Sequence, residues 1–398
     1  MIVQPKFRGF ICTTAHPQGC AWHVKEQIDY VKQQAPFIGP KNVLIIGAST
    51  GYGLASRITA AFGAKAKTLG VFYERPATGV RTATAGWYNS AAFEQFAKTE
   101  NLYAKSINGD AFSNEIKQET IDVIQADLGK VDLVLYSLAS PRRRDPETLK
   151  TYSSVIKPIG SPFVGKTVDF HSGRVSTASI DPAEEIEITE TVKVMGGEDW
   201  VLWLKALKEA HVLAKNCLTA AYSYIGPEVT RAVYRDGTIG KAKENLEASA
   251  VKLNKMLAEI CGKAYISVNK ALVTQSSAAI PVVPLYISLL YRVMKEKGIH
   301  EGCIEQAYRL FAQRLYNQPI STDQQGRIRI DDWEMRQDVQ DKVLSLWEQV
   351  DSENIEFISD LAGFRSEFFK LFGFGIPEID YVADVDPNIP ILSINRLG

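Results

Sequence analysis

The segment YRDGTIGKAK places a tyrosine, Tyr234, and a lysine, Lys243, nine positions apart. In one continuous α-helix, which turns about 100° per residue, nine steps amount to roughly 900°, so the two side chains would face opposite ways. Asp236 and Gly237 form a strong turn signal, which predicts that the chain bends and that a new helix begins near Thr238. With that bend, Tyr234 can fold back toward the ammonium of Lys243.

A phenol beside an ammonium can do acid–base chemistry. The positive charge stabilises the phenolate and lowers the pKa of the tyrosine from a reference value near 10, which makes the phenol a better proton donor at neutral pH. Lys241 competes for this role, but it lies two positions from Lys243 and faces about 200° away on a helix. A packed tyrosine and a solvated lysine at this separation are also a common coincidence. The pair indicates a catalytic site only if a second sequence signal supports it.

The glycine-rich segment GASTGYG is that second signal. It follows the apolar run KNVLIIGAS, precedes the helical start LASRITAAFG, and contains Gly47, Gly51 and Gly53. Glycines between a strand and a helix let backbone N–H groups and the positive end of the helix dipole approach a pyrophosphate. A tight turn without a ligand is the alternative, but this context favours dinucleotide binding. The loop residues expected to contact the cofactor are Gly47, Ala48, Ser49, Thr50, Gly51 and Tyr52.

An acidic residue follows the second apolar run, which ends in FYERP. Glu74 lies about twenty residues beyond the last glycine, where an acid accepts hydrogen bonds from the adenosine ribose hydroxyls. A carboxylate there repels a 2′-phosphate, so we expect NADH to be preferred over NADPH, although Arg75 and Arg81 could soften the preference. Tyr73 is expected to contact the cofactor as well. The alternative is that Glu74 is a surface charge at the end of a strand.

Further cofactor contacts are expected where the next two apolar runs end. Asp110 and Ala111 follow the third run and suit the adenine ring, whereas Leu138 and Ala139 end the fourth and can bring the backbone against the cofactor's sugars. The ammonium of Lys243 can hold the nicotinamide ribose.

The elements that would position these residues alternate between strand and helix. Apolar runs typical of buried strands cover 41–49, 66–74, 103–111, 131–140, 216–226 and 263–274, and helical patterns cover 88–100, 113–129 and 239–262. This alternation predicts an α/β fold, a Rossmann-like doubly wound parallel sheet with helices on both faces.

We expect a single domain over 1–398, with additions to that sheet. These are an N-terminal extension (1–40) with a helix at 23–33, an insertion (141–200) in the 41–280 core, a substrate-covering segment (275–300) and a mostly helical C-terminal extension (301–398) whose clearest helix is 333–350. Within the insertion, 166–180 and 184–194 alternate at period two and predict a β-hairpin that turns at 181–182.

Composition excludes several classes of protein. A net charge of −1 argues against a nucleic-acid partner. The only dense basic run, Arg142 to Arg144, is expected to be a solvated loop, with contact to substrate phosphates as the less favoured reading. Pro281 and Pro284 break the longest apolar tract, so no membrane span is expected. Five cysteines without a CxxC pair, and histidines without partners at ligand spacing, predict neither disulfides nor a metal site. Without a secretory signal, we expect a cytoplasmic protein.

Several motifs resemble one enzyme family. The G-x3-G-x-G loop, SLAS after the fourth strand, and a tyrosine and lysine after the fifth are similar to the short-chain dehydrogenase/reductase superfamily. The wide Tyr-x8-Lys spacing with YSYIG upstream resembles the FabV-type enoyl reductases, also known as trans-2-enoyl-CoA reductases. The similarity covers essentially the whole chain, including RGFICTTAHPQGC, RRRDP, AYSYIGPE and LVTQSSAAIP.

The resemblance implies a reaction and roles for individual residues. The reaction is NADH-dependent reduction of the carbon–carbon double bond of a trans-2-enoyl thioester on acyl carrier protein or coenzyme A. Tyr234 matches the proton donor, Lys243 the cofactor-holding residue and Tyr224 the substrate-contacting tyrosine. The segment Leu272, Val273 and Thr274 matches a further cofactor contact. The family also implies a monomer.

The chemistry is consistent with these residues. Hydride transfer to the β-carbon places negative charge on the thioester carbonyl, and the hydroxyls of Tyr234 and Tyr224 can stabilise it. The apolar tract 276–291 can hold an acyl chain as a lid, or it is an ordinary buried helix. Two alternatives remain: a carbonyl or alcohol oxidoreductase of the same superfamily, in which Tyr-x3-Lys would be expected where Thr238 stands, and a non-catalytic NADH-binding sensor.

Overall fold

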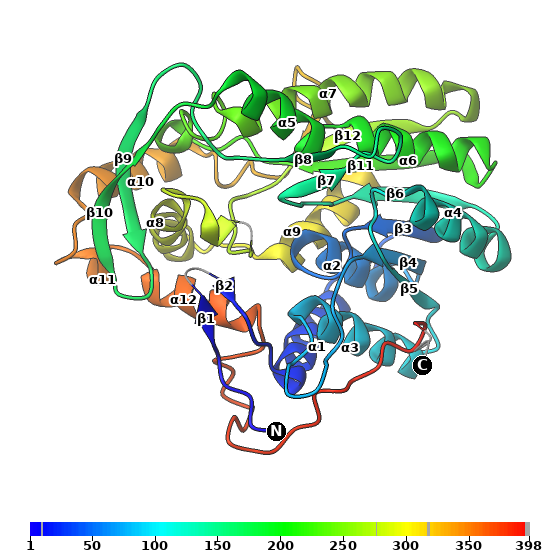
Figure 1. Cartoon of the computed structure of the whole chain (residues 1–398), viewed down its shortest axis with the longest axis horizontal. Helices are drawn as coiled ribbons and strands as arrows, with labels where there is room; N and C mark the ends of the chain where they lie inside the picture. Colours follow the sequence, from blue (N-terminus) through cyan, green and yellow to red (C-terminus); the bar gives the residue numbers. More distant parts are fainter. Residues whose placement is uncertain (9–10, 276, 317–318, 395–398) are drawn as a thin grey trace.

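The computed structural model describes residues 1–8, 11–275, 277–316 and 319–394 (Figure 1). Its centre is a sheet of seven parallel strands in the order β13-β12-β11-β6-β3-β4-β5. The strands are β3 (Asn42–Ile46), β4 (Lys67–Phe72), β5 (Ala104–Asn108), β6 (Val131–Tyr136), β11 (Leu213–Ser223), β12 (Lys263–Val268) and β13 (Arg327–Arg329). The six predicted strands are confirmed. β13 was missed because its three residues, RIR, contain no apolar run.

Helices cover both faces of this sheet, as the alternation predicted. Alternate residues of β3 enter different cores: Val43 and Ile45 pack in one, Leu44 and Ile46 in the other, and all four are fully buried. The helices on the Leu44 side are α4 (Asn114–Val123), α6 (Glu198–Glu209) and α7 (Thr238–Leu257), and those on the other side include α1 (Pro17–Gln33), α2 (Gly51–Ile58), α3 (Ala85–Thr99) and α9 (Cys303–Arg309). The fold is therefore doubly wound.

The insertion between β6 and β11 differs from the prediction. A hairpin is present, but its arms are β9 (Phe163–Asp169) and β10 (Arg174–Ile180), which turn at 170–173. The predicted second arm, 184–194, is instead a helix, α5 (Glu185–Met195). Glu184 and Glu187 form a capping box there, and Thr191 and Val194 are buried three positions apart, as a helix requires. Period-two alternation in a segment with a strong helix start signal was the wrong criterion.

The basic run also has regular structure. Arg142–Arg144 forms strand β7, which pairs with β8 (Thr151–Ser153), so the predicted solvated loop is wrong. Alternation along β7 separates the three side chains: Arg142 and Arg144 are exposed, whereas Arg143 is buried and donates to Glu198 at 2.7 Å. One arginine thus anchors the strand, and the other two remain free to face a ligand.

The two terminal extensions pack against each other. α1 begins at Pro17, six residues before the predicted start, because His16 caps it by accepting from the Gly19 N–H. A Cβ on Gly19 would lie 1.8 Å from the carbonyl oxygen of Gly373, so this helix directly abuts the C-terminal segment. The remaining N-terminal strands are β1 (Phe7–Arg8) and β2 (Ile11–Cys12).

The C-terminal extension wraps around a central helix, α8 (Val283–Glu296), and approaches the β9–β10 hairpin (Figure 1). Its helices after α9 are α10 (Gln337–Gln349), α11 (Ile355–Ile358) and α12 (Leu361–Lys370), followed by a stretch without helix or strand over 371–394. Lys166 of β9 donates to three carbonyl oxygens at the end of α10. The extension is thus mainly helical only as far as Lys370.

The tract expected to cover the substrate contains α8. Pro284 lies in the first turn of this helix, where a missing N–H is tolerated. Most of its residues are buried, from Val283 to Met294, which identifies α8 as a core helix. Residue 276, the first of the predicted 276–291 tract, lies outside the described residues. The reading of this tract as a buried helix is confirmed for α8.

Candidate active site

A cavity of about 1350 Å³ opens at the carboxyl ends of the parallel strands. It is lined by every predicted site residue except one: Gly47, Ser49, Thr50, Gly51, Tyr52, Tyr73, Glu74, Asp110, Ala111, Leu138, Ala139, Tyr224, Tyr234, Lys243, Leu272, Val273 and Thr274. The exception, Ala48, is fully buried in the core beside the glycine loop. Residues predicted from six separate segments therefore face one space, where ligands of open parallel sheets are expected.

The glycine loop has the geometry of a pyrophosphate cradle. Gly47 has a φ of 88°, a conformation that favours glycine, and a Cβ on Gly53 would lie 1.8 Å from the Gly47 carbonyl oxygen. α2 then begins at Gly51, and the side chain of its N-cap, Thr50, makes no capping hydrogen bond. The first N–H groups of α2 are therefore available to an anion, with the helix dipole favouring negative charge.

Glu74 lies beside this loop at the end of β4. Its carboxylate accepts a hydrogen bond from the Ser49 hydroxyl at 2.7 Å, and Asn108, at the end of β5, holds its backbone by donating to the Glu74 carbonyl at 2.9 Å. Burial raises the pKa of Glu74, and hydrogen bonds from Thr84 and Ser49 oppose that shift. The acid is thus a fixed part of the cavity wall, which argues against the reading of a free surface charge.

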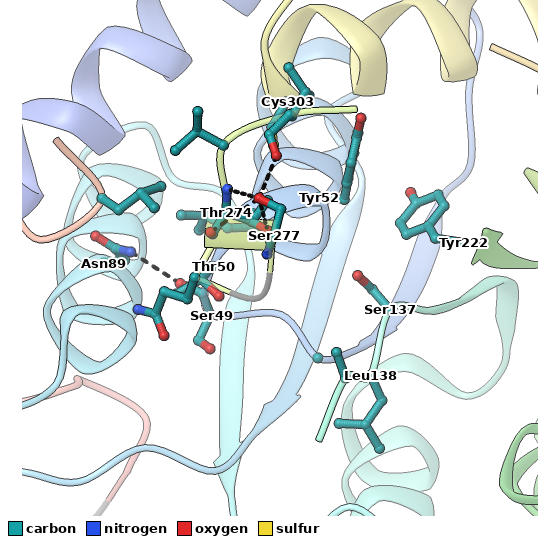
Figure 2. Close-up of a pocket in the computed structure, with 18 of the residues that line it drawn as sticks. Ser49, Thr50, Tyr52, Asn89, Ser137, Leu138, Tyr222, Thr274, Ser277 and Cys303 are labelled. Carbon is teal, nitrogen blue, oxygen red and sulfur yellow. Dashed lines mark hydrogen bonds between the residues drawn. The ribbon is translucent and has the colours of Figure 1, made fainter. Parts of the chain in front are cut away.

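Asn89 of α3 is a polar residue of the cavity wall that sequence reasoning missed. Its Nδ2 donates to the Ser49 carbonyl at 3.2 Å, while its buried Oδ1 has no protein partner among the described residues (Figure 2). A buried acceptor without a partner is costly unless water or a ligand satisfies it. Its sequence context, WYNSAAF, is an ordinary helical pattern and carries no signal for this role.

Tyr234 and Lys243 lie as the bend predicted. Gly237 is the N-cap of α7, which begins at Thr238, and both Tyr234 and Lys243 line the cavity. The competing Lys241 is exposed and pairs with Glu244 at 2.9 Å. The lysine predicted for the site is therefore the one that faces it.

The expected effect of Lys243 on the tyrosine pKa is wrong, however. Burial raises the pKa of Tyr234, and burial lowers the pKa of Lys243 to about 8. Lys243 Nζ donates to the Tyr222 carbonyl at 3.3 Å, and no hydrogen bond joins it to Tyr234 within the described residues. Desolvation by burial is the cause of both shifts, and sequence spacing alone cannot reveal it.

Tyr224 contacts both Tyr234 and a buried carboxylate, Glu334. Its ring packs edge-on against that of Tyr234, with centroids 4.9 Å apart and planes at 80°. Its hydroxyl donates to Glu334 Oε1 at 3.1 Å. Glu334 lies far along the chain, after β13, and no sequence pattern pointed to it.

The segment after β12 forms a second loop at the cavity. Ser277 Oγ donates to the Leu272 carbonyl at 2.7 Å and accepts from the Thr274 N–H at 2.9 Å, which ties the segment into a compact turn (Figure 2). A Cβ on Gly51 would lie 3.8 Å from Thr274 Cγ2, so this turn adjoins the start of α2. Leu272 to Thr274 are therefore placed to contact whatever occupies the glycine loop.

Near this turn, Lys270 and Tyr222 were also missed, whereas Tyr52 was predicted. Lys270 is 2% exposed, and its ammonium donates to the Ala271 carbonyl at 3.0 Å and lies over the Tyr291 ring. Tyr52 donates to the Lys270 carbonyl at 2.8 Å, and the Tyr222 hydroxyl lies 2.5 Å from Ser56 Oγ. These groups come from separate segments, and only the tertiary structure brings them together.

Other expectations concern what the chain lacks. Across the described ranges, no cluster of three or more His, Cys, Asp or Glu side chains could hold a metal ion. The five cysteines are free. No helix in the part of the chain that the structure describes is long and apolar enough to cross a membrane.

A parallel sheet with this loop and this cavity is typical of dinucleotide-binding enzymes. Family models specify the class further: one described as the trans-2-enoyl-CoA reductase catalytic region matches residues 81–316, and one described as the NAD(P)H binding domain of trans-2-enoyl-CoA reductase matches 2–79. The chain belongs to the trans-2-enoyl-CoA reductase family.

Individual relatives are similar over nearly their whole length. The chain is 61% identical to the trans-2-enoyl-CoA reductase [NADH] of Ruminiclostridium cellulolyticum, over 98% of this chain and 99% of that protein. It is 62% identical to the enoyl-[acyl-carrier-protein] reductase [NADH] of Cytophaga hutchinsonii, over 98% and 99%. The crystal structure of Treponema denticola trans-2-enoyl-CoA reductase in complex with NAD matches with a TM-score of 0.95 and 52% identity, over 98% of this chain and 100% of that one. The family resemblance inferred from the sequence motifs is confirmed.

A third family model, described as an enoyl reductase FAD binding domain, matches residues 322–385. The described residues of this span do not fit a flavin dinucleotide. The polar groups that follow β13 are already occupied within the protein: Asp331 pairs with Arg329, Asp332 pairs with Arg309 and Arg314, and Glu334 is fully buried. Helices α10 and α12 pack against α8, and only Glu367 and Lys370, with the neighbouring Leu371, reach the large cavity. This span contributes to the wall of the nicotinamide cofactor cavity.

Proposed function

We propose that this protein is an NADH-dependent reductase that converts trans-2-enoyl thioesters of acyl carrier protein or coenzyme A into the saturated acyl thioesters. The observation that carries the proposal is the single cavity that joins the glycine loop to Tyr224, Tyr234 and Lys243. The names of the relatives, which specify NADH and both thioester carriers, support the same reaction.

The cofactor would be held by groups whose geometry suits it. The loop from Gly47 and the first N–H groups of α2 suit the pyrophosphate, and the fixed carboxylate of Glu74 suits the adenosine ribose. Lys243, which lines the cavity near Tyr222, suits the ribose at the nicotinamide end. When bound, NADH supplies a hydride to the β-carbon (C3) of the enoyl thioester.

Tyr234 is the proposed proton donor. Negative charge develops on the thioester carbonyl oxygen as the double bond is reduced, and a hydrogen-bond donor aimed at that oxygen lowers the barrier. In the part of the chain that the structure describes, the Tyr234 hydroxyl donates to no protein group, so it is available to the substrate. Its proton completes the saturation of C2. Burial raises the pKa of Tyr234, so the hydroxyl is protonated at neutral pH.

The acyl chain would extend toward α8. Ile280, Val283 and Ile287 line the cavity on this side, and an apolar lining is what a hydrocarbon chain requires. Arg142 and Arg144, which line the cavity from the exposed side of β7, would meet the negatively charged carrier. We further propose that the protein works as a monomer in the cytoplasm, without a nucleic-acid or membrane partner. Its net charge of −1 supports the absence of a nucleic-acid partner.

The reaction is tested by mixing the purified protein with NADH and a short trans-2-enoyl-CoA and following the loss of reduced-nicotinamide absorbance. We expect turnover with one NADH oxidised per saturated product, which mass spectrometry identifies. Ketone and aldehyde substrates provide the control for a carbonyl reductase, and we expect no turnover with them. Absence of turnover with any enoyl thioester would retire the proposal in favour of a non-catalytic NADH-binding protein.

A further inference from the structure

Glu334 lies behind the cavity, where three of the segments that line it meet. It is 0% exposed and lies between β13 and α10. Its Oε1 accepts from the hydroxyls of Tyr224, at 3.1 Å, and Tyr286, at 2.7 Å, and its Oε2 accepts from the Ala271 N–H at 2.7 Å. One buried carboxylate thus binds the segment after β11, the helix α8 and the segment after β12.

The surroundings of this carboxylate make it a fixed element. Lys270 supplies a nearby positive charge that opposes the rise of the Glu334 pKa caused by burial. Gln340 of α10 donates both to the Tyr286 hydroxyl at 3.1 Å and to the Glu334 carbonyl at 2.7 Å. A buried polar network whose members are paired holds each member in one arrangement. Glu334 therefore determines where its partners' hydroxyls lie.

Tyr224 is the partner through which Glu334 affects the proposed proton donor. Its hydroxyl donates to Glu334, whereas its ring packs against Tyr234, the proposed proton donor. A displaced Tyr224 would move both the surface that the thioester meets and the support of the Tyr234 ring. Catalytic geometry is sensitive to shifts of this kind, because small misplacements lower the rate strongly.

We propose that Glu334 is a positioning residue for the reduction, which acts by fixing Tyr224 and, through Tyr224, the ring of Tyr234. This inference rests on the proposed function of the cavity. It assigns a task in the reaction to the C-terminal extension, 301–398, because the carboxylate comes from that part of the chain. The extension then contributes to the reaction as well as to the shape of the cavity.

A double-mutant cycle tests the proposal. Glu334→Gln keeps the size of the side chain, removes its charge and presents an amide N–H₂ to one of three hydrogen-bond donors. We expect it to lower kcat/KM for the enoyl thioester roughly tenfold, the effect of losing a hydrogen bond to a charged group. In a Tyr224→Phe background, where the hydroxyl is already absent, Glu334→Gln should lower kcat/KM less than about twofold further.

Controls separate this role from a merely structural one. Asp331→Asn neutralises another buried carboxylate of the same segment, which pairs with Arg329 and does not line the cavity, and it should change kcat/KM less than about twofold. Thermal unfolding and NADH titration verify that each variant folds. If Glu334→Gln does not fold, Glu334→Asp, which keeps the charge beside Lys270 but shortens the reach to Tyr224, takes its place in the cycle.

The outcomes distinguish the two proposals. Equal losses in the wild-type and Tyr224→Phe backgrounds would show that Glu334 acts through the fold or through Ala271, and would overturn the inference. An unchanged kcat/KM for Glu334→Gln would overturn it as well. Either result leaves the reductase function intact, because the wild-type chain still turns over. Absence of turnover by the wild-type chain would instead overturn the proposed function, and the inference with it.

Discussion

The two walls of the cavity are built differently. The cofactor wall, which comprises the glycine loop, Glu74, and the ends of β5 and β6, offers mainly backbone groups from consecutive strands. The catalytic wall comprises Tyr222, Tyr224, Tyr234, Lys243 and Lys270, with the buried Glu334 behind it, and it offers half-buried and buried side chains from distant segments. The first wall depends on close backbone approach, and the second on single polar atoms held by long-range contacts.

This difference predicts which function is lost when a residue of each wall is substituted. On the cofactor wall, an added methyl group displaces backbone and should affect binding of the dinucleotide. On the catalytic wall, removal of one oxygen atom leaves the packing intact and should affect turnover. Substitutions that separate binding from turnover therefore test the comparison directly.

The largest expected effect belongs to Tyr234→Phe. Loss of a general acid lowers turnover by roughly 100-fold or more, and we expect kcat to fall by at least that factor. NADH affinity should remain within about twofold, because the lost hydroxyl makes no contact with the glycine loop. Steady-state kinetics and fluorescence titration of NADH measure the two quantities.

A matched substitution checks that the effect is local. Tyr103 donates its hydroxyl to Asp127 at 2.6 Å and does not line the cavity, so Tyr103→Phe should leave kcat unchanged. If Tyr234→Phe turned over at the wild-type rate, the donor assignment would be wrong. The catalytic wall would then have to act through another group.

Gly53→Ala should produce the next largest effect, on the cofactor wall. Its Cβ would lie 1.8 Å from the Gly47 carbonyl oxygen, so the loop or the start of α2 must shift. We expect NADH affinity to fall roughly tenfold or more, because backbone donors to the pyrophosphate are displaced. Isothermal titration with NADH measures this loss.

Gly129→Ala provides the control for a glycine substitution. Gly129 has a φ of 71° and open space around its Cβ position, and it precedes β6, at the amino ends of the strands, whereas the cavity lies at their carboxyl ends. This change should lower the melting temperature without altering NADH affinity. Equal affinity losses for the two variants would contradict the special role of the glycine loop.

The same difference determines how much of each wall could be predicted from the sequence. Gly47, Glu74 and Asp110 each follow a strand that is recognisable from its apolar run, and parallel strands bring such ends to one edge of the sheet. Glu334 contacts Tyr224 across 110 positions in the chain, and it follows a three-residue strand without an apolar run. Local patterns contain no information on that contact. The position of the cofactor-wall residues at the cavity was therefore predictable, whereas their contacts with a cofactor stay a prediction and Asn89 was missed.

The catalytic wall was predictable only where a family motif covered it. The bend before α7 was read correctly from Asp236 and Gly237, since turn chemistry is local. The direction of the pKa shift of Tyr234 was wrong, because it depends on burial by the surrounding side chains. The predicted second arm of the hairpin was wrong for a different reason: the capping box of α5 is a local signal, and the period-two alternation was given precedence over it.

The pH dependence of NADH binding gives a smaller effect, and it links the two walls through Lys243. Burial lowers the pKa of this lysine to about 8, so its ammonium loses its proton as pH rises past that value. If the ammonium holds the nicotinamide ribose, NADH affinity should decrease up to roughly tenfold above pH 8, as charge-assisted hydrogen bonds are lost. Titrations of NADH across this pH range measure the change.

Lys243→Met should remove this dependence, whereas Lys241→Met should keep it, because Lys241 is exposed and paired with Glu244. The contribution of Lys243 to the stability of the folded protein should change with pH in the opposite direction. A folded-state pKa of about 8, below the ordinary lysine value of about 10.5, means that the unfolded chain binds more protons between these values, so this group's contribution to stability rises with pH there. Identical pH profiles for wild type and Lys243→Met would contradict the assignment.

The smallest expected effect concerns the choice between NADH and NADPH. The Glu74 carboxylate is held by Ser49, so it cannot easily turn away from a 2′-phosphate, and its negative charge opposes that group. Glu74→Gln should raise kcat/KM for NADPH roughly fivefold, the effect of about 1 kcal/mol of relieved repulsion between charges that are largely screened by water. Asp110→Asn provides the control, because it removes a negative charge from the same cavity but leaves the acid at the ribose position in place. The ratio of the kcat/KM values for NADPH and NADH should therefore change only for Glu74→Gln. An unaltered ratio in Glu74→Gln would assign cofactor selection to the exposed Arg75 or Arg81 instead, and would make this acid a structural support for Ser49.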